Sequence, residues 1–343
     1  MPHTLRSLVD LDKEVDILWN QALSPATQIA YNTAFNAFRT FMLMCGFASN
    51  MQVLPYITED TLIYFVTHCA RVLNLKHSTI KLYLCGIRFK YMQAGMQSPF
   101  TTDRNNLPRL ATILQAIKKT HGSSAKQRQP ITYNILTSIC TILRGGVFDT
   151  HTDLLLLTVC VVAFFGFLRC GEFTVRDSFD PTVHLCVGDV HFHMETAFLK
   201  LKSSKSDPFR KGVAVQLHAT GRAICPYSVM KTFMRFRRRS LPQPYDPLFI
   251  TVTGQALSRV VFLNHMRCVY YKMGMDTSRY SGHSFRIGAA TSAAEAPLED
   301  HIIKVLGRWS SDCYTRYIRT PHSTIQAAQR AMAMDADSST QRP

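Results

Sequence analysis

The stretch "LLLLTVCVVAFFGFLRCGEF" runs from Leu154 to Phe173 and ends a long apolar run with two charged residues. The apolar part, through Leu168, is 15 residues long, which is short for a membrane-spanning helix of roughly 20 residues. We therefore expect a helix buried in the core of a soluble domain. Arg169 follows this helix directly, and a buried arginine needs a partner. Glu172, three residues later on the same helical face, is the expected partner.

The overall composition is that of a globular and strongly basic protein. The chain has 343 residues, enough for two domains with cores of their own. Hydrophobic residues make up 46% of the chain and charged residues 18%, which argues against a disordered protein. The net charge of +16 favours a polyanionic partner, most commonly nucleic acid. A basic enzyme without such a partner is the alternative.

The ten cysteines follow neither a disulfide nor a metal-binding pattern. No two of them are spaced as Cys-x-x-Cys, and they are scattered among apolar neighbours. The opening "MPHTLRSLVDLDKEVD" is too polar and acidic for a secretory signal. We therefore expect reduced thiols and an intracellular protein, located in the nucleus if the source is eukaryotic.

The first part of the chain is expected to be a small all-helical domain at 21–120, after an N-terminal extension at 1–20. The expected helices run from Ser24 to Gly46, from 59 to 73, from a cap at Ser78 to about Gly95, and from 107 to 119. The face of the third helix opposite its apolar stripe is expected to carry Lys81, Arg88 and Lys90. Basic residues without interleaved acids fit a phosphate-facing surface, although a solvated helix face is the plainer interpretation.

The middle of the chain contains a linker and a small sheet. Residues 121–131, with Lys126 and Arg128, are small, polar and basic, and they predict an interdomain linker that could lie along a nucleic-acid backbone. Short alternating runs between 187 and 217 predict an antiparallel sheet with a hairpin. The fold class is therefore mainly α with a small antiparallel sheet. The second domain covers 132–330, and a disordered tail covers 331–343.

Several residues of the second domain could act on a phosphate. His283 and Arg286 are one helical turn apart in "GHSFRIGAA". Arginine presents a planar fork of donors, so Arg169 and Arg286 together could clamp one phosphodiester. Lys205 lies in the turn of the predicted hairpin, where a lysine can protonate a leaving oxygen, although an exposed turn lysine without a function is as ordinary.

These residues, in this order, resemble the tyrosine recombinase and phage integrase superfamily, which includes Cre- and Xer-like proteins. The likeness extends to the recombinases of eukaryotic DIRS and Ngaro elements, and it covers nearly the whole chain. It rests on "LRCGE", "KSSK", "GHSFRIGAA", "LGRWS" and "YIR". The resemblance implies a catalytic set of Arg169, Lys205, His283, Arg286, Trp309 and Tyr317, supported by Glu172. It also implies that 21–120 is a core-binding domain. The candidate DNA contacts are Lys81, Arg88 and Lys90 of this domain and Lys126 and Arg128 of the linker.

The resemblance further implies a mechanism without metal or other cofactor. Tyr317 would attack a phosphate of double-stranded DNA to give a 3′-phosphotyrosine, and Lys205 would protonate the 5′-hydroxyl that leaves. The two arginines would stabilise the transition-state charge. Four protomers would exchange strands on DNA during integration of a mobile element, and the free protein could be a monomer. No membrane partner is expected.

The sequence leaves several alternatives open. Tyr314 is a rival nucleophile, and Arg308 competes with Trp309 for its position because the step from Trp309 to Tyr317 is one residue shorter than in Cre. The chain could also bind DNA without cutting it, or relax DNA as a topoisomerase does. His184, Cys186, His191 and His193 could form a metal site but lack a compact set of four ligands. The basic run at 234–240 could bind phosphates, serve as a nuclear localisation patch, or be a solvated helix end.

Overall fold

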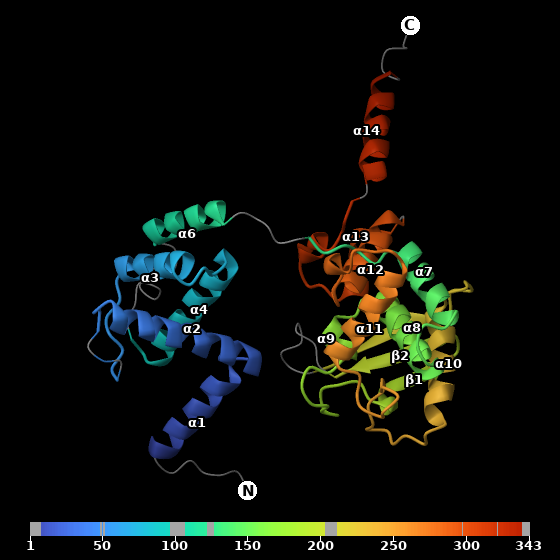
Figure 1. Ribbon diagram of the computed structural model, residues 1–343, viewed down its shortest axis with the longest axis horizontal. Helices are drawn as coiled ribbons and strands as arrows, with labels where there is room; N and C mark the ends of the chain where they lie inside the picture. Colours follow the sequence, from blue (N-terminus) through green and yellow to red (C-terminus); the bar gives the residue numbers. More distant parts are fainter. Residues whose placement is uncertain are drawn as a thin grey trace. The chain divides into compact units, whose positions relative to one another are not determined.

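The computed structural model describes residues 8–48, 50, 52–96, 107–121, 127–202, 211–296, 298–320 and 322–337. The chain divides into two compact units, 1–125 and 126–343 (Figure 1). The division lies within the expected linker at 121–131. No helix in the described part of the chain is both long and apolar enough to cross a membrane.

The first unit is a bundle of helices. They are α1 (Leu8–Gln21), α2 (Pro25–Met44), α3 (Glu59–Arg71), α4 (His77–Gln93) and α6 (Pro108–Thr120). Phe38, Phe65 and Tyr91 form its fully buried aromatic centre. Ser24 caps α2 by accepting a hydrogen bond from the amide of Thr27, as expected.

Two features of this unit differ from the sequence expectations. The stretch expected as an extension contains α1, whose Trp19 packs edge-on against Phe89 of α4 with ring centroids 5.6 Å apart. Ser78 does not cap α4, because the helix already begins at His77 and its N-cap, Lys76, makes no side-chain hydrogen bond.

The second unit is built around one apolar helix. Its helices are α7 (Tyr133–Arg144), α8 (Thr150–Phe165), α9 (Cys170–Phe173), α10 (Pro226–Arg238), α11 (Arg259–Lys272), α12 (Ser284–Glu295), α13 (Asp300–Gly307) and α14 (His322–Asp337), with 3-10 turns at Val187–Asp189, Thr277–Arg279 and Asp312–Arg316. α8 is buried almost all round and packs against α7, α10 and α12. The prediction of a buried helix is confirmed.

A three-stranded antiparallel sheet completes this unit. The strands β1 (Val190–His193), β2 (Thr196–Leu201) and β3 (Val213–His218) pair in the order β1-β2-β3. In the register, Leu199 lies opposite both Val190 and Val215, so these apolar side chains share the face that packs on the core. The predicted fold class is therefore confirmed. The turn between β2 and β3 falls at 203–210, outside the described residues.

The expected linker and tail both carry structure. Within the linker, Ile131 is fully buried and its amide donates to the carbonyl of Ser284, so residues next to α7 belong to the second unit. Gly288 permits this approach, because a Cβ there would lie 1.7 Å from the carbonyl oxygen of Ile131. The tail expected to be disordered from 331 is helical as far as Asp337. A polar composition did not reveal either arrangement.

Candidate active site

The site begins where α8 ends. Gly166 caps the helix, and Phe167 adopts a left-handed backbone conformation with φ +49°, which costs a residue other than glycine about 1–2 kcal/mol. Arg169 then becomes the N-cap of α9. Its Nη1 donates to Glu172 Oε1 at 2.9 Å, and its backbone amide donates to Oε2 at 2.9 Å. The expected pair of Arg169 and Glu172 therefore forms. Its side chains make an ion pair, and the Glu172 carboxylate also caps α9 by accepting from the Arg169 amide.

A second arginine reaches the same carboxylate from the other end of the unit. Arg308 follows α13 in a left-handed conformation with φ +55°, and its Nη2 donates to Glu172 Oε2 at 2.8 Å. Its guanidinium also donates to the carbonyl of Gly166 at 3.2 Å and to that of Phe167 at 3.3 Å. Burial lowers the pKa of Arg308, and the carboxylate of Glu172 opposes that shift.

The third arginine, Arg286, is fully buried in the first turn of α12. Its two terminal nitrogens donate to the carbonyls of Phe167 and Gly307, so it joins α8, α12 and α13. Burial lowers the pKa of Arg286 to about 10, and the neighbouring guanidiniums of Arg169 and Arg308 act in the same direction. The group still carries its charge at neutral pH.

We name Arg169, Arg286 and Arg308 with their shared neighbour Glu172 the arginine cluster. Three guanidiniums face one carboxylate, so the cluster carries an excess of two positive charges in a buried position. Such an excess is costly without an anion nearby. Arginine forks match the oxygens of a phosphate, so the cluster is suited to bind and polarise a phosphodiester.

Aromatic side chains cover the cluster. The Arg286 guanidinium lies over the Trp309 ring at 4.4 Å and over the Tyr317 ring at 5.6 Å. The rings of Trp309 and Tyr317 are 5.1 Å apart. Trp309 packs there only because Gly307 has no side chain, since a Cβ would lie 1.8 Å from its ring. Of the two neighbours, Arg308 makes the polar contact with Glu172, and Trp309 makes ring contacts with Arg286 and Tyr317.

The two candidate tyrosines differ in their surroundings. Tyr314 is buried, and a hydrogen bond with the carboxylate of Asp300 raises its pKa to about 12. Tyr317 is half-buried at the end of the turn Asp312–Arg316, and its amide donates to the carbonyl of Tyr314 at 2.8 Å. Tyr317 is thus the tyrosine that combines partial exposure with contact to the arginine cluster.

The two remaining members of the predicted catalytic set are His283 and Lys205. His283 is exposed at the N-cap of α12, and its amide donates to the hydroxyl of Ser281 at 3.3 Å. Lys205 lies outside the described residues. The structure therefore brings together Arg169, Glu172, Arg286, Trp309 and Tyr317, and it adds Arg308.

The predicted DNA contacts of the first unit do not share one face. Lys81 and Arg88 are exposed and seven residues apart, so they lie on one side of α4. Lys90 is two residues further, about 200° around a helix, and its Nζ donates to Gln93 at 3.4 Å. The expectation that one face carries all three is wrong for Lys90. Lys118 of α6, which no sequence motif indicated, lies near His77 together with Lys81. Burial lowers the pKa of His77, and the charges of Lys81 and Lys118 lower it further.

The two linker residues have different outcomes. The guanidinium of Arg128 donates a hydrogen bond to the carbonyl of Ser278, so its position is held by the second unit. Lys126 lies outside the described residues. Contact of either residue with DNA stays a prediction.

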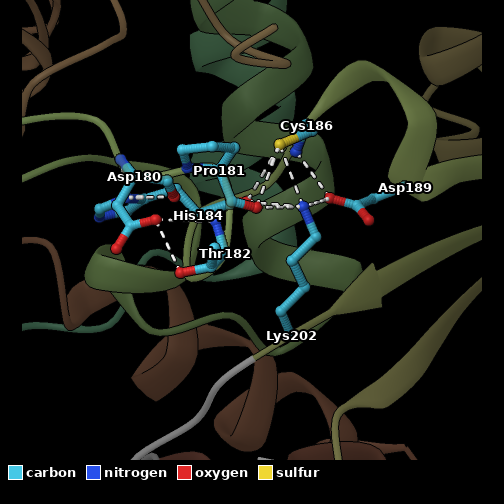
Figure 2. Close-up of polar contacts among 7 residues, drawn as sticks. All are labelled: Asp180, Pro181, Thr182, His184, Cys186, Asp189 and Lys202. Carbon is cyan, nitrogen blue, oxygen red and sulfur yellow. Dashed lines mark hydrogen bonds and ion pairs between the residues drawn. The ribbon is translucent and has the colours of Figure 1, made fainter. Parts of the chain in front are cut away.

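The structure shows the surroundings of two further groups of residues that the sequence singled out. No group of three potential metal ligands occurs among the described residues. His191 and His193 are exposed on β1, whereas His184 stacks on Phe179 and Cys186 contacts Lys202 (Figure 2). In the basic run, Arg237 is buried and donates to Ser240 and to the carbonyl of Pro247, which is a structural role.

Solved structures share this architecture. A XerH site-specific recombinase bound to difH substrate is 15% identical, with a TM-score of 0.59 over 88% of this chain and 78% of that one. A lambda integrase dimer bound to a COC′ core site is 14% identical, with a TM-score of 0.55 over 90% and 76%. The Tn1549 transposon integrase in complex with transposon right end DNA is 12% identical, with a TM-score of 0.54 over 81% and 86%.

The chain has the tyrosine-recombinase fold. In sequence, no family model and no curated protein matches it. Because the structural neighbours are distant in sequence, the likeness concerns the fold, and the chemistry has to be inferred from the residues of this chain.

Proposed function

We propose that the protein is a site-specific DNA recombinase that cleaves and rejoins strands through a covalent 3′-phosphotyrosine. The observation that carries this proposal is the meeting of the arginine cluster with Tyr317, whose ring lies 5.6 Å from the Arg286 guanidinium. A nucleophilic phenol next to three arginines and one carboxylate is suited to phosphoryl transfer without a metal ion. The tyrosine-recombinase fold agrees with this chemistry.

In the proposed reaction, the Tyr317 oxygen attacks phosphorus while the bond from phosphorus to the 5′-oxygen breaks. Arg169 and Arg286 stabilise the charge on the non-bridging oxygens. The leaving 5′-oxygen takes a proton, for which Lys205 is the proposed donor. The phenol of Tyr317 loses its proton to His283, or to water if His283 instead positions the phosphate. The phosphotyrosine bond retains the energy of the broken strand, so a 5′-hydroxyl can reverse the reaction.

We assign the attack to Tyr317 rather than Tyr314. The hydrogen bond with Asp300 raises the pKa of Tyr314 to about 12, which makes its phenol harder to deprotonate. Tyr314 is also buried, at 4% exposure. A buried phenol that is hydrogen-bonded to a carboxylate is a poor nucleophile, whereas Tyr317 is half-buried and its ring lies 5.6 Å from the Arg286 guanidinium.

The test is a nicked suicide substrate, from which the short fragment that carries the new 5′-hydroxyl diffuses away and leaves the protein attached to the 3′-phosphate of the remaining DNA. The wild-type protein should form a covalent adduct that survives denaturing electrophoresis. Tyr317→Phe should form none, whereas Tyr314→Phe should retain adduct formation. If wild-type protein binds duplex DNA but never forms an adduct, it is a DNA-binding protein that does not cut. Relaxation of supercoiled DNA by a monomer would indicate a topoisomerase instead.

The finer proposal is that the protein serves integration of a mobile element in the nucleus, as a tetramer on double-stranded DNA. It is supported by the net charge of +16 and by the exposed Lys81 and Arg88 of the helical unit. Its test is a strand-exchange assay with two duplexes. Recombinant products and a four-protomer complex are expected, and adducts without exchange would contradict it.

A further inference from the structure

A buried threonine connects the helix that carries Arg286 with the segment that carries Tyr317. Thr291 lies in α12 and is 2% exposed. Its hydroxyl donates to the carbonyl of Tyr317 at 3.4 Å and accepts from the amide of Arg319 at 3.0 Å. One hydroxyl can make both bonds because it is a donor and an acceptor at once. The backbone that follows Tyr317 is therefore attached to α12.

Threonines elsewhere in the helices of the second unit use their hydroxyls differently. Thr158 of α8 is fully buried and donates to the carbonyl of Leu154, four residues earlier, at 2.8 Å. Thr141 of α7 makes the same kind of bond, which is an ordinary one for threonine within a helix. The hydroxyl of Thr291 instead bonds to a segment 26 to 28 residues further along the chain. It thus serves a tertiary contact rather than its own helix.

The segment from Tyr317 to Arg319 leaves the 3-10 turn Asp312–Arg316 and leads toward α14. On its N-terminal side, the amide of Tyr317 donates to the carbonyl of Tyr314 at 2.8 Å, a bond within the turn itself. Two residues later, the amide of Arg319 bonds to Thr291 of α12. The first bond moves with the turn, whereas the second fixes the segment relative to a different element. Thr291 therefore limits how far the backbone of Tyr317 can shift.

The same helix carries the arginine that faces the Tyr317 ring. Arg286 precedes Thr291 by five residues, about 7.5 Å along the helix axis, and its guanidinium lies 5.6 Å from the ring of Tyr317. α12 is held firmly in the unit, because Gly288 packs so closely that a Cβ there would lie 1.7 Å from the carbonyl oxygen of Ile131. One fixed helix thus sets both the guanidinium and the backbone of the phenol. A displacement of about 1 Å between reacting groups can cost roughly 100-fold in rate.

We propose that Thr291 is a positioning residue for the cleavage reaction. Its hydroxyl holds the backbone of Tyr317 in place relative to Arg286, so that the phenol oxygen is aligned with the phosphorus of a phosphate on the arginine cluster. This inference rests on the proposed function. A threonine that only stabilises the fold would make the same two hydrogen bonds, so the experiment must separate positioning from stability.

The rate of adduct formation on the nicked suicide substrate, measured in a single turnover at several protein concentrations, makes that separation. Thr291→Val removes the hydroxyl and keeps the shape of the side chain. It should lower the maximal rate roughly 10- to 100-fold. The protein concentration that gives half of the maximal rate should change by less than about threefold, because DNA binding is not affected. Thr291→Ser keeps the hydroxyl, and its maximal rate should stay within about threefold of wild type.

Thr158→Val is the matched control. It removes a buried hydroxyl from α8 that contacts neither Tyr317 nor Arg319, so its maximal rate should also stay within about threefold of wild type. Circular dichroism verifies that each variant is folded under the assay conditions. Equal slowing by Thr158→Val and Thr291→Val would show that the loss follows stability, and it would overturn the inference. A wild-type rate in Thr291→Val, or a Thr291→Ser variant as slow as Thr291→Val, would overturn it as well.

Amide hydrogen exchange tests the contact in the wild-type protein, and it serves if Thr291→Val fails to fold. Because Thr291 accepts its hydrogen, the amide of Arg319 should exchange at least about 100-fold more slowly than in an unstructured peptide. Exchange of this amide at the unprotected rate would contradict the inference alone. Wild-type protein that protects the amide but never forms an adduct would instead contradict the proposed function, and the positioning role with it.

Discussion

Arg308 and Glu172 lie 136 residues apart in the chain and are joined by a 2.8 Å ion pair. This contact links the end of α13 to the beginning of α9. The same carboxylate holds Arg169, so one acidic group sets the positions of two arginines. Since Arg286 and Arg308 both donate to the carbonyl of Phe167, the three arginines form one connected network.

Removing the charge of Glu172 should destabilise the second unit. Glu172→Gln keeps the size of the side chain but leaves three guanidiniums without their counter-charge. We expect the free energy of unfolding to fall by about 3–5 kcal/mol, measured by urea denaturation followed by circular dichroism. Glu299→Gln, which removes an exposed partner of His301, should change it by less than about 1 kcal/mol. Equal effects of the two substitutions would argue against the network.

Arg286→Lys should abolish most of the cleavage while leaving DNA binding in place. Lysine cannot donate to two carbonyls on different segments and lie flat on the Trp309 ring. We expect adduct formation to slow by at least about 100-fold, with less than threefold change in a gel-shift assay. Arg144→Lys is the control, because Arg144 is exposed and donates to the carbonyl of Ala223. Cleavage by Arg286→Lys at the wild-type rate would refute a role for the guanidinium.

Gly307→Ala should disturb the aromatic cover of the arginine cluster. The added Cβ would lie 1.8 Å from the Trp309 ring, so the ring must move away from Arg286. We expect a loss of about 1–3 kcal/mol in the free energy of unfolding and a drop in adduct yield. Gly171→Ala is the matched control, since a Cβ there meets nothing within 4 Å. If Gly307→Ala and Gly171→Ala behave alike, the tight contact is unimportant.

The stability of the second unit should fall as the pH decreases below about 6.5. Burial lowers the pKa of His151, the nearby Arg237 acts in the same direction, and Asp149 opposes it. Below about pH 6.5, His151 therefore binds a proton more readily in the unfolded chain than in the folded protein, and this difference favours unfolding. Urea denaturation at pH 7.5 and pH 5 should show this decrease. His151→Leu should make this decrease in stability smaller. His193→Gln, which alters an exposed histidine, should leave it unchanged. A decrease of wild-type size in His151→Leu would show that His151 is not its cause.

Local patterns in the sequence correctly predict several parts of the protein. The buried helix ending at Phe165 follows from its uninterrupted apolar composition, and the pair of Arg169 with Glu172 follows from their spacing of three residues. The small sheet follows from alternation, because side chains of a strand point alternately to its two faces. Lys90 was misplaced because the angle around a helix, rather than nearness in sequence, decides which face a residue shares.

Contacts between residues that are distant in the chain could not be predicted from such patterns. Arg308 has no local signal for its contact with Glu172, since the contact requires the left-handed turn after α13 to face the end of α8. The structure separates Tyr314 from Tyr317, because Tyr314 is buried and hydrogen-bonded to Asp300 whereas the Tyr317 ring lies beside the Arg286 guanidinium. The hydroxyl of Thr291 bonds to a segment 26 to 28 residues further along the chain, which no local pattern indicates. Local patterns follow from the geometry of single elements, whereas these contacts depend on how several elements pack, which no short stretch of sequence contains.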